Sequence, residues 1–234
     1  PCKRVPATDW IYGIGFTYMK GDSKLANGGT GDNWIGSISL YGVRKFQNGG
    51  YLDLILKGSR LNNEFTAISD QFRYISKGKY HTYALQASVE YGNKHYLDKA
   101  KTWYVDPELQ LTYGHIKGVK YRTFNALNVD VHNLNSLIGR AGVAIGKEGK
   151  NGSAFLKVDG LREFMGEYKA RYHLDHGAWN KSRISMKDTW GGGITIGGTY
   201  NFHKDTYGFI QAKKSFAADL KQEYRVDTGI RYLF

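Results

Sequence analysis

The segment Tyr224–Phe234, YRVDTGIRYLF, has a strict two-residue periodicity that decides how the chain is interpreted. One parity carries the apolar and aromatic residues, Tyr224, Val226, Thr228, Ile230, Tyr232 and Phe234. The other parity carries Arg225, Asp227 and Arg231. This alternation predicts a strand with one apolar and one charged face, and aromatic rings at both ends of the apolar face suit a strand that crosses a bilayer. The last strand of a soluble barrel would show the same alternation.

The composition favours an all-β protein. The chain has 234 residues, with 30 Gly, 18 Tyr and only 3 Pro. No run of about 18 apolar residues is present, so no transmembrane helix is expected. The mean hydropathy of −0.50 is compatible with a membrane barrel, because only alternate residues of its strands face lipid.

The net charge of +12 is spread over the predicted loops and forms no compact basic stripe with interleaved aromatics. Nucleic acid is therefore not expected as a partner, and lipid headgroups or acidic glycans suit a diffuse charge better. Cys2 is the only cysteine, so no intramolecular disulfide can form. The chain begins at Pro1 without a visible signal peptide, and we expect it to be a piece of a longer protein.

Nine further segments alternate in the same way and predict an antiparallel up-and-down barrel of about ten strands. The predicted strands are residues 10–20, 34–45, 51–61, 81–92, 103–113, 135–146, 153–164, 189–202 and 206–214. Long polar loops are predicted at 21–33, 62–78, 114–133 and 165–187, and tight turns alternate with them, as in outer-membrane barrels.

Each predicted strand has a polar face and an apolar face. The residues expected to face a water-filled lumen are Asp53, Lys57, Glu90, Asp106, Glu108, Arg140, Lys157, Asp159, Glu163, Arg225, Asp227 and Arg231. The residues expected to face lipid are Leu52, Leu54, Leu56, Tyr83, Leu85, Val89, Ile194 and Ile196. A soluble β-sandwich would place these two faces the other way round. Aromatic residues gather at strand ends, which favours the membrane arrangement.

Several stretches together resemble the C-terminal translocator barrel of autotransporters, the type V secretion proteins. They include SLYGVRKFQNGGYLDLILKGSRLNNEF (39–65), YALQASVEYG (83–92), VDPELQLTYGHIKG (105–118), SLIGRAGVAIG (136–146) and YRVDTGIRYLF (224–234). The resemblance implies a barrel of about twelve strands in the bacterial outer membrane, with both termini periplasmic, that anchors and helps to export an N-terminal passenger. Its implied partners are outer-membrane lipid, the barrel assembly machinery and the passenger of the same precursor.

The resemblance also implies that the alternating residues from Tyr224 to Phe234 form the signal that the assembly machinery reads. Residues 10–20 are similar to the family's third strand, so residues 10–234 would form the barrel and residues 1–9 a lead-in. We expect the ten strands to close on themselves, with the first paired to the last.

The strongest candidate pairing in the lumen joins Arg140 to Glu90 or Glu108, since buried charges need partners. Asp53, Asp106 and Glu163 are weak candidates for self-cleavage of a passenger, because no specific motif surrounds them. The segment His173-Leu174-Asp175-His176 suggests an omptin-like protease or a metal site only weakly.

We therefore expect no enzyme, no cofactor and no metal. The alternative function is a small porin- or adhesin-like barrel whose extracellular loops bind ligands.

Overall fold

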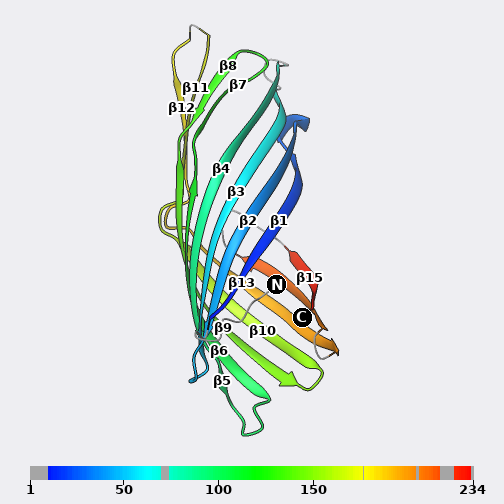
Figure 1. The fold of residues 1–234 in the computed structure, drawn as a ribbon. Coiled ribbons are helices and arrows are strands. Elements are labelled where there is room, and N and C mark those ends of the chain that lie inside the picture. Colours follow the sequence, from blue (N-terminus) through cyan, green and yellow to red (C-terminus); the bar gives the residue numbers. More distant parts are fainter. Residues whose placement is uncertain (1–9, 70–73, 176, 204–205, 217–223, 233–234) are drawn as a thin grey trace.

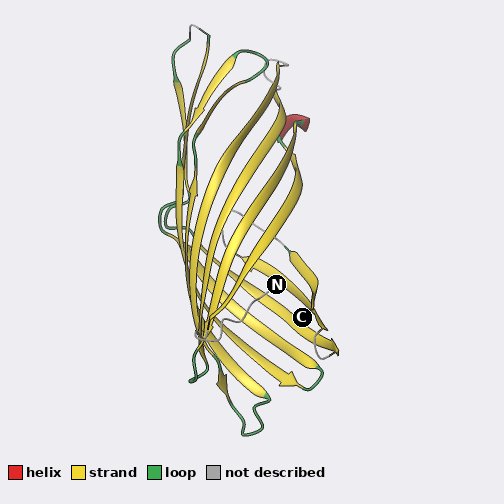
Figure 2. Cartoon of the chain, in the orientation of Figure 1, coloured by secondary structure: helices red, strands yellow, loops and turns green. Residues whose placement is uncertain are grey.

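The chain folds into one long, curled antiparallel sheet with a smaller sheet above one end (Figures 1 and 2). In the computed structural model the described residues are 10–69, 74–175, 177–203, 206–216 and 224–232. The lead-in expected at residues 1–9 and the terminal residue Phe234 lie outside them. The all-β fold and the antiparallel up-and-down order predicted from the sequence are confirmed.

Ten strands follow one another along the main sheet in chain order. They are β1 (Trp10–Lys24), β2 (Thr30–Lys45), β3 (Gly50–Ser69), β4 (Tyr74–Asn93), β6 (Trp103–Ile116), β9 (Leu134–Gly149), β10 (Gly152–Glu163), β13 (Trp190–His203), β14 (Thr206–Phe216) and β15 (Arg225–Tyr232). The two-residue strand β5 (His95–Tyr96) pairs with β6. A single 3-10 turn, η1 (Ala26–Gly28), joins β1 to β2.

The main sheet is a curled half-barrel with two free edges. Among the described residues β1 pairs with β2 alone, and β15 pairs with β14 alone. The expected closure of the first strand onto the last is therefore wrong for this structure. Figure 1 shows the red strand β15 standing apart from the blue strand β1.

Two of the predicted long loops are strands. The segment 21–33 belongs mostly to β1 and β2, and the segment 62–78 belongs mostly to β3 and β4. β3 and β4 each have 20 residues, which is about 66 Å of extended chain and far more than a bilayer crossing needs. A strand that continues into water loses its apolar face, so its periodicity disappears and its sequence is like that of a loop.

The other two predicted loops fold into hairpins that pair with each other. The hairpin strands are β7 (Val119–Arg122), β8 (Leu127–Val131), β11 (Glu167–Leu174) and β12 (Asn180–Ser185). β8 pairs with β11, which gives a four-stranded sheet in the order β12-β11-β8-β7. This distal sheet stands above the main sheet in Figure 1.

The tight turns gather at the opposite end. A tight turn at residues 46–49 joins β2 to β3. The φ angle of Gly49 in this turn is 86°, a conformation that favours glycine. The turns that follow β9 and β13 lie at the same end. The antiparallel order also brings the start of β1 and the end of β15 to this end.

The fold has no apolar core. The only buried hydrophobic residues described are Tyr104, Ala144 and Ala170, whereas Phe16 is 78% exposed and Ile14 is 62% exposed. No helix among the described residues is both long and apolar enough to span a membrane. An extended sheet with its apolar side chains on the outside is unstable in water, which indicates an apolar solvent around that face.

Candidate functional site: the polar concave face

The concave face of the main sheet carries ion pairs that bridge across an intervening strand. Lys157 of β10 donates a hydrogen bond to Glu108 of β6, across β9. The residue of β9 opposite Glu108 is Gly142, which has no side chain to separate them. Side chains on the inside of a curved sheet converge, so contacts between strands that are not neighbours identify this face as the concave one.

A second ion pair on the same face centres on Asp159 of β10. Lys213 of β14 donates to both of its carboxylate oxygens, at 2.9 Å and 3.2 Å. The Nε of Arg140 lies 3.9 Å from the same carboxylate. The predicted partners of Arg140, Glu90 and Glu108, are therefore wrong, although Arg140 lies on the predicted face. The strand register explains this choice of partner. Arg140 lies opposite Leu161 of β10, and Asp159 is two residues from Leu161 on the same face of that strand.

Four carboxylates gather on the β3, β4 and β6 side of this face. Asp53 lies directly opposite Glu90, and Glu108 lies opposite Gly92. The Tyr51 hydroxyl is 3.4 Å from Oδ2 of Asp106, while Oδ1 of Asp106 is buried and has no hydrogen-bond partner among the described residues. Oδ1 of Asp53 is also buried without one.

The basic side chains lie mostly on the other half of the face. Arg140, Lys157, Lys213 and Arg225 come from β9, β10, β14 and β15. Arg225 donates to Asp227 at 2.9 Å, and Gln211 donates to the same carboxylate at 3.0 Å. These side chains and the carboxylates of β6 line a groove of about 520 Å³. The predicted Lys57 lies on the same face, opposite Ser39 and Gln86, whereas the side chain of Arg231 lies outside the described part of the structure.

Glu163 has a different environment from the other predicted lumenal charges. Its carboxylate accepts hydrogen bonds from the backbone N–H groups of Leu137 at 2.8 Å and of Met165 and Gly166 at 3.0 Å. The Ser136 hydroxyl donates a further one. Glu163 therefore fastens the end of β10 to β9 and is separate from Asp53 and Asp106. The structure does not bring the three self-cleavage candidates together.

Aromatic side chains on the concave face lie flat over glycines of the neighbouring strand. Tyr51 covers Gly92, where an added Cβ would lie 2.3 Å from the ring, and Tyr104 covers Gly146, where the distance would be 2.4 Å. In both cases ring and glycine are directly opposite in register. Gly92 and Gly146 are therefore sites of close packing between strands.

The convex face carries the residues predicted to face lipid. Leu54, Leu56, Tyr83, Leu85, Val89, Ile194 and Ile196 are all exposed, and Leu52 is half-buried beside Tyr91. The last strand also turns its predicted apolar residues outward. Tyr224, Val226 and Ile230 are exposed, and Thr228 lies opposite the exposed Ile210. Tyr232 ends β15, but its side chain is outside the described residues.

The distal sheet has its own polar and aromatic contacts. Arg171 donates to Asp130 at 2.7 Å and 3.0 Å, and this hydrogen bonding holds the pKa of the Asp130 carboxyl below its usual range. Tyr121 of β7 stacks on Tyr80 of β4 at 4.7 Å, and burial raises the pKa of Tyr121 to about 12. The Arg171–Asp130 pair joins β11 to β8 within the distal sheet, and the Tyr121–Tyr80 contact fastens that sheet to the main sheet.

The candidate protease residues of the distal sheet are engaged in structural contacts. The His173 ring lies 3.9 Å from the Trp179 ring, and Asp175 accepts hydrogen bonds from Arg122 and Asn128. His176 lies outside the described residues. Among those described, no group of three His, Cys, Asp or Glu side chains could hold a metal ion.

A sequence comparison accounts for this architecture. The sequence model of the family described as Autotransporter beta-domain matches residues 3–213. The chain belongs to the autotransporter β-domain family. The resemblance inferred from the sequence is thereby confirmed.

Curated autotransporters match the chain only over a short part of their own length. The probable autotransporter YcgV of Escherichia coli K12 is 27% identical over 94% of this chain and 22% of its own length. The pertactin autotransporter of Bordetella bronchiseptica is 31% identical over 67% of this chain and 17% of its own length. Some relatives are named serine proteases, such as EspC of Escherichia coli O127:H6, where the match covers 8% of that protein. The chain thus matches between 8% and 22% of the length of these relatives.

Solved autotransporter domains have the same fold. The β-domain of the Bordetella autotransporter BrkA superposes with a TM-score of 0.78 at 21% identity, over 96% of this chain and 83% of that one. The translocator domain of NalP from Neisseria meningitidis superposes with a TM-score of 0.72 at 14% identity, over 98% of this chain and 77% of that one. The autotransporter β-domain fold is therefore confirmed at the level of structure.

Proposed function

We propose that this chain is the translocator of a type V secretion protein, which anchors the precursor in the outer membrane and helps to export an N-terminal passenger. One observation carries the proposal: apolar side chains cover the convex face of a barrel-type sheet, while ion pairs such as Asp159–Lys213 line the concave face. A bilayer around the sheet and water inside it satisfy both faces at once. Membership of the autotransporter β-domain family supports this assignment.

The proposed partners follow from the two faces and from the family. Outer-membrane lipid would cover the exposed leucines of β3 and β4, and the passenger of the same precursor would use the polar bore. The segment from Tyr224 to Phe234 would be the part that the barrel assembly machinery reads. In the same proposal residues 10–234 form the barrel domain. The barrel acts as a conduit without catalysis, and any activity belongs to the passenger.

We propose that the tight-turn end is periplasmic and the distal sheet extracellular. Cysteine labelling of cells that produce the full-length precursor tests this orientation. Each variant carries Cys2→Ser and one new cysteine. Phe124→Cys, at the 91% exposed tip of the β7–β8 hairpin, should react with an impermeant maleimide on intact cells. Asn48→Cys, in a tight turn, should react only after the outer membrane is permeabilised. The opposite labelling pattern would reject the orientation.

Export is tested with the same precursor by adding protease to intact cells. The passenger should be degraded while the barrel stays protected. A barrel that is folded in the outer membrane, together with a passenger that remains in the periplasm, would rule out the translocator function. That result would favour the porin- or adhesin-like alternative. Liposome swelling would then test for a pore, and ligand binding by the distal sheet would test for an adhesin.

A further inference from the structure

The convex face of β1 to β4 carries a compact group of basic and aromatic side chains where its apolar band ends. We call this group the rim patch, and its members are Tyr18, Lys20, Trp34, Arg60, His81 and Tyr83. All six side chains are exposed. On one side of the patch the convex face continues with Phe16, Ile38 and Leu85, and on the other side the strands continue into their polar extensions.

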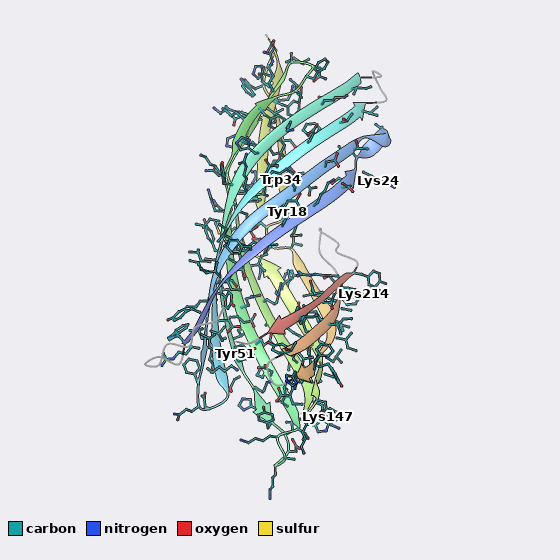
Figure 3. All side chains as sticks on the ribbon, turned by 45° about the vertical axis from the view of Figure 1, so that its right-hand side comes forward. Tyr18, Lys24, Trp34, Tyr51, Lys147 and Lys214 are labelled. Atoms are coloured by element: carbon teal, nitrogen blue, oxygen red, sulfur yellow. The ribbon has the colours of Figure 1, made fainter. Side chains whose placement is uncertain are left out.

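Strand register brings the six residues together in two adjacent rows. The upper row contains Lys20, Trp34 and His81, in that order across the strands. The lower row contains Tyr18, Arg60 and Tyr83, with Gly36 between Tyr18 and Arg60. The Tyr18 and Trp34 rings are 6.2 Å apart and inclined by 30°. Figure 3 shows Tyr18 and Trp34 beside each other on the blue strands, below the end of β1 at Lys24. Because Gly36 has no side chain, the Trp34 ring can lie beside it, 3.6 Å from the position of a Cβ.

The basic groups of the rim patch have no acidic partner. No ion pair among the described residues includes Lys20, Arg60 or His81. Asn62 lies between Trp34 and His81 in register, and its side-chain nitrogen is buried without a hydrogen-bond partner in the described structure. Exposed cations at the edge of an apolar band, with no acidic partner beside them, are free to bind an anion from outside the chain.

Other outward-facing cations near this end of the sheet already have partners. Arg162 donates to Asp188 at 2.7 Å and lies over the Trp190 ring. Lys214 donates to the Tyr224 hydroxyl at 3.3 Å and lies over the Phe216 ring. The rim patch differs from both sites because Lys20 and Arg60 have no ion-pair partner among the described residues.

We propose that the rim patch binds the phosphorylated sugar headgroup of the glycolipid that forms the outer leaflet of bacterial outer membranes. Lys20 and Arg60 would contact phosphate oxygens, for which the guanidinium fork is well suited. The Trp34 and Tyr18 rings would pack against the sugar and the first part of the acyl chains. This site deepens the proposed function, because it requires the barrel to lie in that membrane.

The row above the rim patch fixes the height at which the phosphate binds. Asp22, Asp32 and Glu64 lie opposite one another there, and in the described part of the chain only Glu64 has a basic partner, Lys79 in the same row, at 3.1 Å. Carboxylates repel phosphate, so this row excludes the anion. The headgroup is thereby confined to the level of Lys20 and Arg60, at the end of the apolar band.

The test measures lipid binding to the full-length precursor, purified in detergent, by native mass spectrometry. The probes are bisphosphorylated lipid A and the same lipid without its phosphates. The variant Lys20→Gln/Arg60→Gln is compared with Lys24→Gln/Lys79→Gln, which removes the same charge from the acidic row and the level above it. We expect the first variant to bind bisphosphorylated lipid A roughly 25-fold more weakly, since each basic group near an anionic lipid surface contributes about fivefold. The second variant should bind as the wild type does.

Two results would overturn the proposal. One is equal binding of the two lipids by the wild-type protein, and the other is unchanged binding by Lys20→Gln/Arg60→Gln. A folding defect is excluded by the shift in gel mobility that a folded barrel shows on heating. If the precursor never reaches the outer membrane, the proposed function is rejected. If the precursor inserts normally but the wild-type protein does not distinguish the two lipids, only the rim-patch proposal is rejected.

Discussion

Lys213 of β14 reaches Asp159 of β10 by crossing Gly193 of the strand between them, β13. The Nζ atom lies 2.9 Å and 3.2 Å from the two carboxylate oxygens. A Cβ at Gly193 would lie 2.6 Å from the Cε atom of Lys213, so any side chain there would displace the lysine. The side chain of Asp159 is only 1% exposed, so Lys213 is the partner of a buried carboxylate.

Asp159→Asn should destabilise the sheet because it leaves Lys213 and Arg140 without their shared carboxylate. Removing one partner of a buried ion pair costs about 3 kcal/mol. The measurement is the urea concentration at the midpoint of unfolding in detergent, and the folded fraction is monitored by heat-sensitive gel mobility. Asp22→Asn is the control, since its side chain is exposed, and it should leave the midpoint unchanged. Equal midpoints for Asp159→Asn and the wild type would show that the ion pair contributes nothing.

Gly92→Ala should be strongly destabilising, because the new Cβ would meet the Tyr51 ring at 2.3 Å. Overpacking of this kind costs about 1–3 kcal/mol. Gly58→Ala and Gly160→Ala are matched controls within strands, since no atom lies within 4 Å of a Cβ at either position. The double variant Gly92→Ala/Tyr51→Ala should recover part of the loss. The same urea titration measures all four variants, and a Gly92→Ala midpoint equal to that of Gly58→Ala would contradict the packing argument.

Leu56→Arg and Ile55→Arg distinguish a bilayer from water around the convex face. Leu56 on the convex face is 47% exposed, and Ile55 on the concave face is 42% exposed. In water the two substitutions should have equal effects. With lipid outside, Leu56→Arg should cost about 2–4 kcal/mol and Ile55→Arg far less. The fraction of each variant that folds into lipid vesicles measures the difference, and equal yields would argue against a membrane-facing convex side.

The distal sheet should loosen in acid. The hydrogen bonds from Arg171 lower the pKa of the Asp130 carboxyl below its ordinary value of 3.8, so the folded state binds the proton less tightly than the unfolded state does. The resulting stabilisation is present above that value and disappears as the pH falls through the folded-state pKa. The protection factors of the β8 and β11 amides, which correct for the intrinsic exchange rate at each pH, should therefore fall as the pH drops below about 3.8. Asp130→Asn should remove the pH dependence, and a variant that keeps it would assign the effect to another group.

Within the described strands, alternation in the sequence was sufficient to predict which residues share a face. Period-two alternation places Leu85 outside and Asp106 inside without any knowledge of the neighbouring strands. It could not predict partners, because these depend on register and curvature. Lys157 and Glu108 meet across a whole strand, at a glycine that only the paired structure identifies.

The polar segments were harder to predict for a different reason. A strand that leaves the bilayer has water on both faces, so residues 62–69 of β3 show no alternation although they pair with β4 throughout. Glu163 was assigned to the polar face because it has the same parity as Lys157 and Asp159. Its role depends on the N–H groups of Leu137, Met165 and Gly166, which the turn after β10 brings around it.

The length of β3 and β4 sets the height at which an exported chain would leave the barrel. Twenty residues tilted by about 40° rise about 50 Å, and a hydrocarbon layer takes up about 30 Å of this. The remaining distance of roughly 20 Å is a wall that stands over the sugars of the cell surface. On the proposed function, a polypeptide emerging along this wall would reach open solvent only beyond that layer, already clear of the membrane.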